Sequence, residues 1–276
     1  MTRLPLGAST FSYIYTHSAF DAVMHLADLG FNDAEVVIFP PHLWPTELDA
    51  GERRDIPRRL ADRGVAMRSF CFPFDDNNLN SLLPEMRSLT LDMYRRIIDL
   101  AGEWGVPNLL LLPGKMHPFF PPPFEPMLEW LVGAIRELAP HAKAAGVKLL
   151  LENVPSTFLP TSQHLMMALD KAGEDSVGIN LDVCNAVSAG EDPCQALRRV
   201  KDRLGLVHLA DRGPEHHEKQ PIGGGIVDFE PVAETLRDIG YQGYSMLEVV
   251  TLDDPDGGLK ESCRVLSQWG WEAAGG

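Results

Sequence analysis

Residues 146–152 read Gly-Val-Lys-Leu-Leu-Leu-Glu, where a helix-ending glycine leads into an apolar strand that stops at an acidic residue. Glycine suits the left-handed position that closes a helix, so glycine followed by an apolar residue indicates a change from helix to strand. The same signal recurs at Gly30-Phe31, Gly64-Val65, Gly105-Val106, Gly205-Leu206 and Gly240-Tyr241. The chain is therefore predicted to repeat a βα unit.

Eight short β-type runs fit this repeat. They are Leu4–Ser9, Ala34–Phe39, Ala66–Phe72, Leu109–Leu112, Lys148–Leu151, Val177–Leu181, Leu206–Leu209 and Tyr244–Val249. Between them lie segments with one apolar stripe at helical spacing, for example Phe229, Val232 and Leu236. Helix starts are marked by Ser18 with Asp21, by Thr161 and by Asp192-Pro193.

Strands that alternate with helices predict a parallel sheet, and eight such units close a barrel. The predicted fold is α/β, a (β/α)₈ TIM barrel formed as a single domain over residues 1–276. An open doubly wound sheet is the alternative, but no strand is followed by GxGxxG. Gly223-Gly224-Gly225 has neither that spacing nor a preceding strand, so we assign it no phosphate-binding role.

Composition limits the classes of partner. The chain has 39 acidic and 24 basic residues, a net charge of −15, and this field repels nucleic acid and anionic membranes. Small, neutral or weakly charged substrates fit better. Residues 1–7 lack the features of a signal peptide and no stretch is apolar enough to span a bilayer, so we expect a cytoplasmic protein.

The four cysteines show no CxxC spacing, and we expect reduced thiols rather than disulfides or a zinc site. They are Cys71, Cys184, Cys194 and Cys263, of which Cys184 follows a candidate metal ligand by two residues.

Polar residues end four consecutive predicted strands, the fifth to the eighth: Glu152, Asp182, His208 and Glu248. Barrel active sites form at these carboxyl ends. One acidic residue there is often a loop cap and one histidine often a core residue, but four in phase favour a site. Three converging carboxylates repel one another unless a cation neutralises them. We predict one divalent ion, with Mn²⁺, Mg²⁺ or Co²⁺ preferred for an oxygen-rich set and Zn²⁺ as an alternative.

Five segments carry a resemblance to a known superfamily. They are residues 150–153 (Leu-Leu-Glu-Asn), 181–183 (Leu-Asp-Val), 207–211 (Val-His-Leu-Ala-Asp), 223–229 (Gly-Gly-Gly-Ile-Val-Asp-Phe) and 240–248 (Gly-Tyr-Gln-Gly-Tyr-Ser-Met-Leu-Glu). With these motifs, nearly the whole chain resembles the xylose-isomerase-like sugar isomerase/epimerase superfamily, which also contains dehydratases and endonuclease IV-type enzymes.

The resemblance implies that Glu152, Asp182, His208 and Glu248 bind the metal. In ketose 3-epimerases the glutamates that match Glu152 and Glu248 also act as catalytic acid and base on opposite faces of the substrate. The metal then polarises a carbonyl and lowers the cost of an enediolate.

One position departs from the pattern. Many relatives have histidine three residues after the aspartate, where this chain has Asn185. An asparagine side chain can donate a hydrogen bond to a substrate oxygen but cannot replace an imidazole ligand of a second metal. Together with the negative net charge, this disfavours a DNA-repair nuclease.

Six further residues are candidates for substrate contacts or for support of the site: Asn185, Asp211, Arg212, Lys115, His117 and His217, with His216 beside the last. Asp211 and Arg212 follow His208 and can orient it or grip a substrate oxygen; a surface ion pair is the alternative. The others lie on loops expected at the mouth of the barrel.

We therefore expect a metal-dependent isomerase or epimerase of a sugar, polyol or related hydroxy-carbonyl compound, with a role in carbohydrate metabolism. A dehydratase of the inosose or dehydroshikimate type is the nearest alternative, because it uses the same metal and base to remove a β-hydroxyl. A non-catalytic sugar- or metal-binding barrel and a nuclease are less favoured. Barrels of this kind often form homo-oligomers.

Overall fold

The computed structural model describes residues 2–74, 76–215 and 219–275. Its strands are β1 (Leu4–Ser9), β2 (Asp33–Val37), β3 (Ala66–Cys71), β4 (Asn108–Leu111), β5 (Lys148–Glu152), β6 (Gly178–Asp182), β7 (Leu204–Leu209), β8 (Ser245–Leu247) and β9 (Trp271–Ala273). Its helices are the 3₁₀ turn η1 (Phe11–Tyr13), then α1 (Ala19–Asp28), α2 (Ala50–Asp62), α3 (Pro84–Trp104), α4 (Phe124–Ala144), α5 (Ser162–Ala172), α6 (Val183–Ser188), α7 (Pro193–Val200), α8 (Phe229–Asp238) and α9 (Pro255–Ser267). No helix in this part of the chain is both long enough and apolar enough to cross a bilayer.

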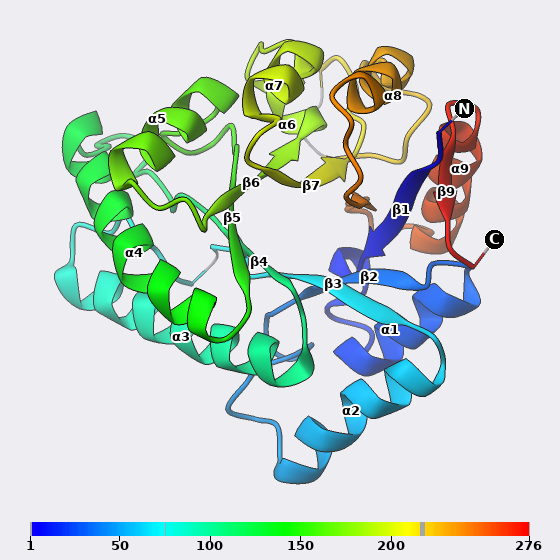
Figure 1. Cartoon of the computed structure of the whole chain (residues 1–276), viewed down its shortest axis with the longest axis horizontal. Helices are drawn as coiled ribbons and strands as arrows, with labels where there is room; N and C mark the ends of the chain where they lie inside the picture. The colour runs from blue at the N-terminus through cyan, green and yellow to red at the C-terminus, as the bar shows by residue number, and fades with distance from the viewer. Residues whose placement is uncertain (1, 75, 216–218, 276) are drawn as a thin grey trace.

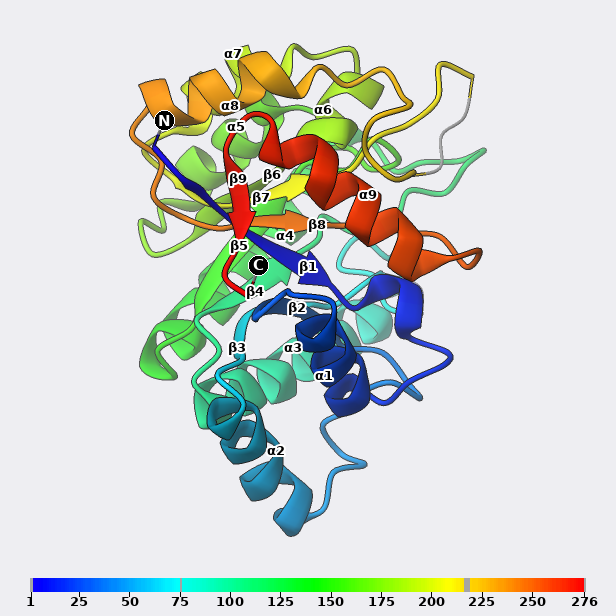
Figure 2. The same cartoon turned by 90° about the vertical axis from the view of Figure 1, so that its right-hand side faces the viewer.

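The strands form a closed parallel barrel (Figure 1). Hydrogen bonding runs from β2 through β8 to β1, and the pairing of β1 with β2 closes the ring. The helices surround the strands in both views (Figures 1 and 2). The (β/α)₈ prediction is therefore confirmed, and the open sheet is wrong.

Two apolar layers hold the barrel together. The larger one lies between the strands and the surrounding helices, and it includes the predicted stripe residues Phe229, Val232 and Leu236 of α8. The smaller one fills the barrel interior with one buried side chain from each of several strands: Val37, Cys71, Leu110, Leu150, Leu206 and Met246. The interior is thus packed, and polar groups can converge only at its carboxyl end.

Strand register brings the predicted polar residues to one level. Asp182 lies opposite His208 in the β6–β7 ladder. The Glu248 amide donates to the Leu209 carbonyl at 3.0 Å, which continues the ladder one residue beyond β8. Because side chains in a strand alternate, Leu150 and Glu152 share a face, as do Met246 and Glu248. The polar side chains therefore stand above the interior core.

One of the six glycines predicted to end a helix does not do so. Gly30, Gly64, Gly105, Gly146 and Gly240 have the expected positive φ values of 97°, 75°, 68°, 74° and 69°. Gly205 instead lies inside β7, where a Cβ atom would stand 2.5 Å from Cδ2 of Leu150. Glycine is needed there for space inside the barrel and not for its conformational freedom.

The ninth strand was not predicted, because its three residues are too few for a periodic signal. β9 pairs in parallel with residues 4–6 of β1, on the edge opposite β8, and lies beside β1 in Figure 2. Trp271 of β9 is fully buried, donates from Nε1 to Oγ of Ser245 at 3.0 Å and meets Phe229 edge to face. This tryptophan joins the first strand, the last barrel strand and α8.

We expect Trp271→Ala to lower the free energy of unfolding by about 3–5 kcal/mol, since it leaves a large cavity and an unpaired Ser245 hydroxyl. Urea unfolding followed by circular dichroism measures the loss. Trp269→Ala is the matched control, because Trp269 is only half-buried, and we expect a clearly smaller change. Equal losses in the two variants would contradict this role of β9.

Candidate metal centre

The structure brings the four predicted ligands together. Glu152 and Asp182 are the last residues of β5 and β6, His208 is in β7, and Glu248 follows β8. One ligand atom of each lies within 4.8 Å of the others, and all four side chains are buried. Four consecutive strands thus deliver three carboxylates and one imidazole to a single point.

Asp182 is held in place by its neighbours. The Asn153 side chain accepts from the Asp182 amide at 2.9 Å and donates to the Asp182 carbonyl at 3.0 Å. Oδ1 of Asp182 accepts from the Asn185 amide at 2.8 Å and so caps the start of α6. Oδ2 remains turned toward the cluster.

A buried carboxylate supports His208 from behind. Nδ1 of His208 lies 3.1 Å from Oε2 of Glu248 and 3.7 Å from Oε1 of Glu152, on the ligand side. Nε2 lies 3.0 Å from Oε2 of Glu35, which also accepts the Ser69 hydroxyl at 2.7 Å. A carboxylate in this place fixes the orientation of a metal-binding imidazole and raises its basicity.

Glu35 was not among the predicted residues. It lies in β2, across the barrel from β7, and it is fully buried. Its signal in the sequence is one acidic residue inside the apolar run 34–39, where a charge is costly unless it has a partner.

Lys219 also joins the cluster without having been predicted. Its Nζ lies 2.6 Å from Oδ2 of Asp182 and donates to Oε2 of Glu248 as well. The side chain is 18% exposed. A single lysine in a loop has no periodic or spacing signal, so only the fold reveals that it reaches the strand ends.

Burial and neighbouring charges separate the two glutamates electrostatically. Burial raises the pKa of Glu152 to about 8; the positive charges of His208 and Lys219 act to lower this pKa, whereas the negative charges of Glu248 and Asp182 act to raise it. Burial also disfavours the charged form of Glu248, but Lys219 and His208 together hold its pKa well below the usual value. Burial lowers the pKa of His208, yet Glu35, Glu248 and Glu152 outweigh it and leave that pKa raised.

The donor set fits a divalent cation. Three buried carboxylates and one imidazole present more negative charge than one side-chain cation neutralises, and oxygen-rich sets of this kind suit Mn²⁺, Mg²⁺ or Co²⁺. A second group of possible ligands, Glu35, Cys71 and Glu248, shares Glu248 with the first. Cys184 belongs to neither group; burial raises its pKa to about 12, and all four cysteines are free thiols.

Asn185 lies beside the cluster, whereas Arg212 bonds elsewhere. Nδ2 of Asn185 donates to the Asn153 carbonyl at 2.9 Å and lies 3.5 Å from Oε1 of Glu152. Arg212 is buried and donates from Nη1 to Oγ of Ser188 at 2.9 Å. Its guanidinium therefore ties α6 to the loop after β7.

Asp211 is bound into its own loop. Its carboxylate accepts from the amides of Arg212, Gly223, Gly225 and Val227 at 2.9–3.2 Å. A Cβ atom at position 225 would stand 2.1 Å from Oδ1 of Asp211, so only glycine permits this approach. The amides of the glycine run thus bind the carboxylate of Asp211.

The remaining candidates lie on loops. The Lys115 backbone exchanges two hydrogen bonds with the Asn78 side chain, at 3.0 and 3.1 Å. His117 is exposed, and its Nδ1 accepts from the amides of Phe119 and Phe120. His216 and His217 lie outside the described residues.

A cavity of about 250 Å³ opens over the cluster. Its polar lining is Glu152, Asn185, Lys219, Glu248 and the Cys71 thiol. Its apolar walls come from Phe11, Pro73, Phe74, Leu112, Val154 and Val250. Convergent polar groups at the base of an apolar pocket are typical of a small-molecule site.

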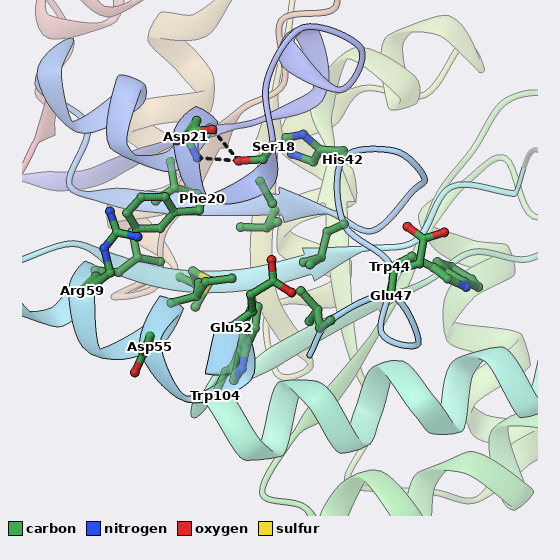
Figure 3. A pocket seen from close by; sticks show the side chains of 18 of the residues that line it. Ser18, Phe20, Asp21, His42, Trp44, Glu47, Glu52, Asp55, Arg59 and Trp104 are labelled. Carbon is green, nitrogen blue, oxygen red and sulfur yellow. Dashed lines mark hydrogen bonds between the residues drawn. The ribbon is translucent and has the colours of Figure 1, made fainter. Parts of the chain in front are cut away.

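A larger cavity, of about 470 Å³, lies between α1, α2 and the loop before α2 (Figure 3). Several of its polar side chains already have local partners. Ser18 caps α1, and its hydroxyl donates to the Asp21 carboxylate. The Glu52 carboxylate accepts from the Asp49 amide, and the Arg59 guanidinium lies over the Phe20 ring. Size alone therefore does not mark the reactive site.

Curated relatives of this chain include proteins with a named activity. The chain is 25% identical over 236 residues to fructoselysine 3-epimerase of Shigella flexneri, covering 82% of this chain and 83% of that protein. It is 29% identical over 139 residues to inosose dehydratase of Clostridium perfringens, covering 44% of this chain and 47% of that enzyme. An uncharacterized protein of Methanocaldococcus jannaschii is 26% identical over 188 residues, covering 66% of this chain and 64% of that one. The chain thus matches less than two thirds of the length of the last two.

Solved structures share the fold over almost the whole chain. A D-tagatose 3-epimerase-like protein superimposes with a TM-score of 0.82 at 22% identity, covering 97% of both chains. The 3-keto-D-glucoside 4-epimerase from E. coli gives a TM-score of 0.81 at 20% identity, covering 96% of this chain and 100% of that one. The family model described as a xylose isomerase-like TIM barrel matches residues 23–269. The chain therefore belongs to the xylose isomerase-like TIM barrel family.

Proposed function

We propose that this protein is a divalent-metal-dependent epimerase or isomerase of a sugar or related hydroxy-carbonyl compound. The observation that carries the proposal is the pair of buried glutamates, Glu152 and Glu248, which lie three strands apart in the barrel and share one cluster with Asp182 and His208. Two carboxylates from different strands that line one small cavity are suited to remove a proton from a substrate and to return one to it.

The four clustered side chains would hold the metal ion, which when bound supplies a Lewis acid that polarises a substrate carbonyl. Glu248 removes the proton from the carbon beside the carbonyl, and the electron pair moves onto the carbonyl oxygen to give an enediolate. Glu152, in its protonated form at this step, returns a proton to the other face of that carbon. No atom is gained or lost, so the product is an isomer.

The cavity supports a small substrate. Its volume of about 250 Å³ is small for a ligand pocket, and its walls are largely apolar. Glu35 acts behind His208 as a positioning residue. The epimerase activity of the relative from Shigella flexneri agrees with this reaction class, at 25% identity.

We expect one divalent ion per chain. Asp182→Asn and His208→Ala each remove a ligand and should lower Mn²⁺ occupancy well below one, as measured by elemental analysis after metal loading and desalting. Asp175→Asn and His141→Ala are matched controls with solvent-exposed side chains. Full occupancy in both ligand variants would refute the metal site.

We also expect Glu152→Gln and Glu248→Gln to separate chemistry from metal binding. Each keeps an oxygen donor and nearly the same shape but loses the proton-accepting charge, so activity should fall by about 10²–10⁴-fold. Metal occupancy should fall far less. Glu272→Gln, at an exposed position in β9, is the control. Nearly full activity with metal retained would rule out the acid–base role.

Product analysis distinguishes this reaction from that of the inosose dehydratase relative, which is 29% identical over 44% of the chain. D-Tagatose, D-fructose and an inosose are incubated with metal-loaded protein in D₂O and followed by NMR and mass spectrometry. We expect an isomer with deuterium on the carbon beside the carbonyl, provided that the abstracted proton exchanges with solvent. A product lighter by one water would assign a dehydratase instead.

A further inference from the structure

The Lys219 side chain stands among the proposed metal ligands. Its ammonium group bonds to one oxygen of Asp182 and one of Glu248, from the sixth and eighth strands. Both oxygens belong to side chains that would hold the metal. An ammonium and a divalent ion cannot share these oxygens, because like charges a few ångströms apart repel strongly in a buried site.

The backbone is built to deliver this side chain. Gln220, the next residue, forms an antiparallel bridge with Asp211: the Asp211 amide donates at 3.1 Å and the Gln220 amide at 2.7 Å. Asp211 is anchored by the amides of the glycine run, and Ile222 donates to the Ser262 hydroxyl at 2.9 Å. Lys219 is thus fixed in the loop ten residues beyond the end of β7, next to the cluster.

We propose that Lys219 is the internal counter-cation of this centre: its ammonium neutralises Asp182 and Glu248 while no metal is bound, and it must leave these oxygens when a metal enters. Lys219 then sets how tightly the site binds metal. This inference rests on the proposed metal site, but it concerns a residue outside the four ligands.

The geometry allows the exchange without unfolding of the loop. The lysine stem has four rotatable carbons, and the side chain is already partly exposed at the wall of the cavity. The ammonium can therefore move from the carboxylates into the cavity while the Asp211–Gln220 bridge stays intact. Metal binding is then a replacement of one cation by another, and its affinity is reduced by the ion pairs that must break.

The test compares wild type, Lys219→Met and Lys219→Arg after removal of metal with a chelator. Methionine keeps the length of the stem and removes the charge, whereas arginine keeps the charge. We expect Lys219→Met to bind Mn²⁺ at least about tenfold more tightly in calorimetric titration, because no internal cation has to be displaced. Without metal it should unfold about 5 °C or more below wild type, since two buried carboxylates lose their partner. Lys219→Arg should stay near wild type in both measurements.

Lys201→Met is the matched control for loss of one positive charge, because Lys201 is an exposed residue just after α7. It should change neither quantity. Lys219→Gln repeats the titration with a polar neutral side chain should the methionine variant fail to fold. Equal or weaker Mn²⁺ binding by the neutral variants, with wild type binding normally, would overturn the role of Lys219 alone. Absence of Mn²⁺ binding in wild type would instead sink the metal site and this inference with it.

Discussion

The concentration of negative charge at the carboxyl end of the barrel constrains the rest of the site. Glu152, Asp182 and Glu248 converge within a few ångströms in a buried place, and Glu35 adds a fourth carboxylate behind His208. Such a group is tolerated only if positive charge is brought to it. The chain supplies two positive side chains, His208 and Lys219, and their number remains below that of the carboxylates. The remaining imbalance is the physical argument for the divalent cation that we propose at this site.

The loop after β7 serves this charge balance through its backbone. Asp211 uses its carboxylate to gather the amides of the glycine run, and its own backbone bridges to Gln220. That arrangement places Lys219 beside Asp182 and Glu248, far along the chain from both. Asp211, which was predicted to support the site or to contact substrate, therefore fixes the conformation of this loop. Lys219, which has no signal in the sequence, lies at the centre of the cluster.

The candidate site differs from the larger cavity in its chemistry and not in its size. The space between α1 and α2 has more volume, but several of its acidic and basic groups cap helices or contact near neighbours. Over the cluster, by contrast, carboxylates from different strands point at a common space whose walls are apolar. Buried carboxylates that converge on one cavity are suited to bind a cation and to transfer protons. Their convergence, and not the cavity volume, is therefore the better criterion for a functional site.

The sequence by itself determined the barrel and the four residues that cluster at its carboxyl end, because both depend on local signals. Helix-ending glycines and apolar runs repeat with the βα unit, and a polar residue that ends a strand of a parallel barrel must lie at the active face. Only the tertiary structure revealed Glu35, Lys219 and β9. Glu35 meets His208 across the closed barrel, Lys219 arrives from a loop without periodicity, and β9 is too short for a pattern. Gly205 shows the same limit. In sequence, a glycine required because a side chain would clash cannot be told from one required for a positive φ, and only the position of Leu150 in the fold reveals the clash.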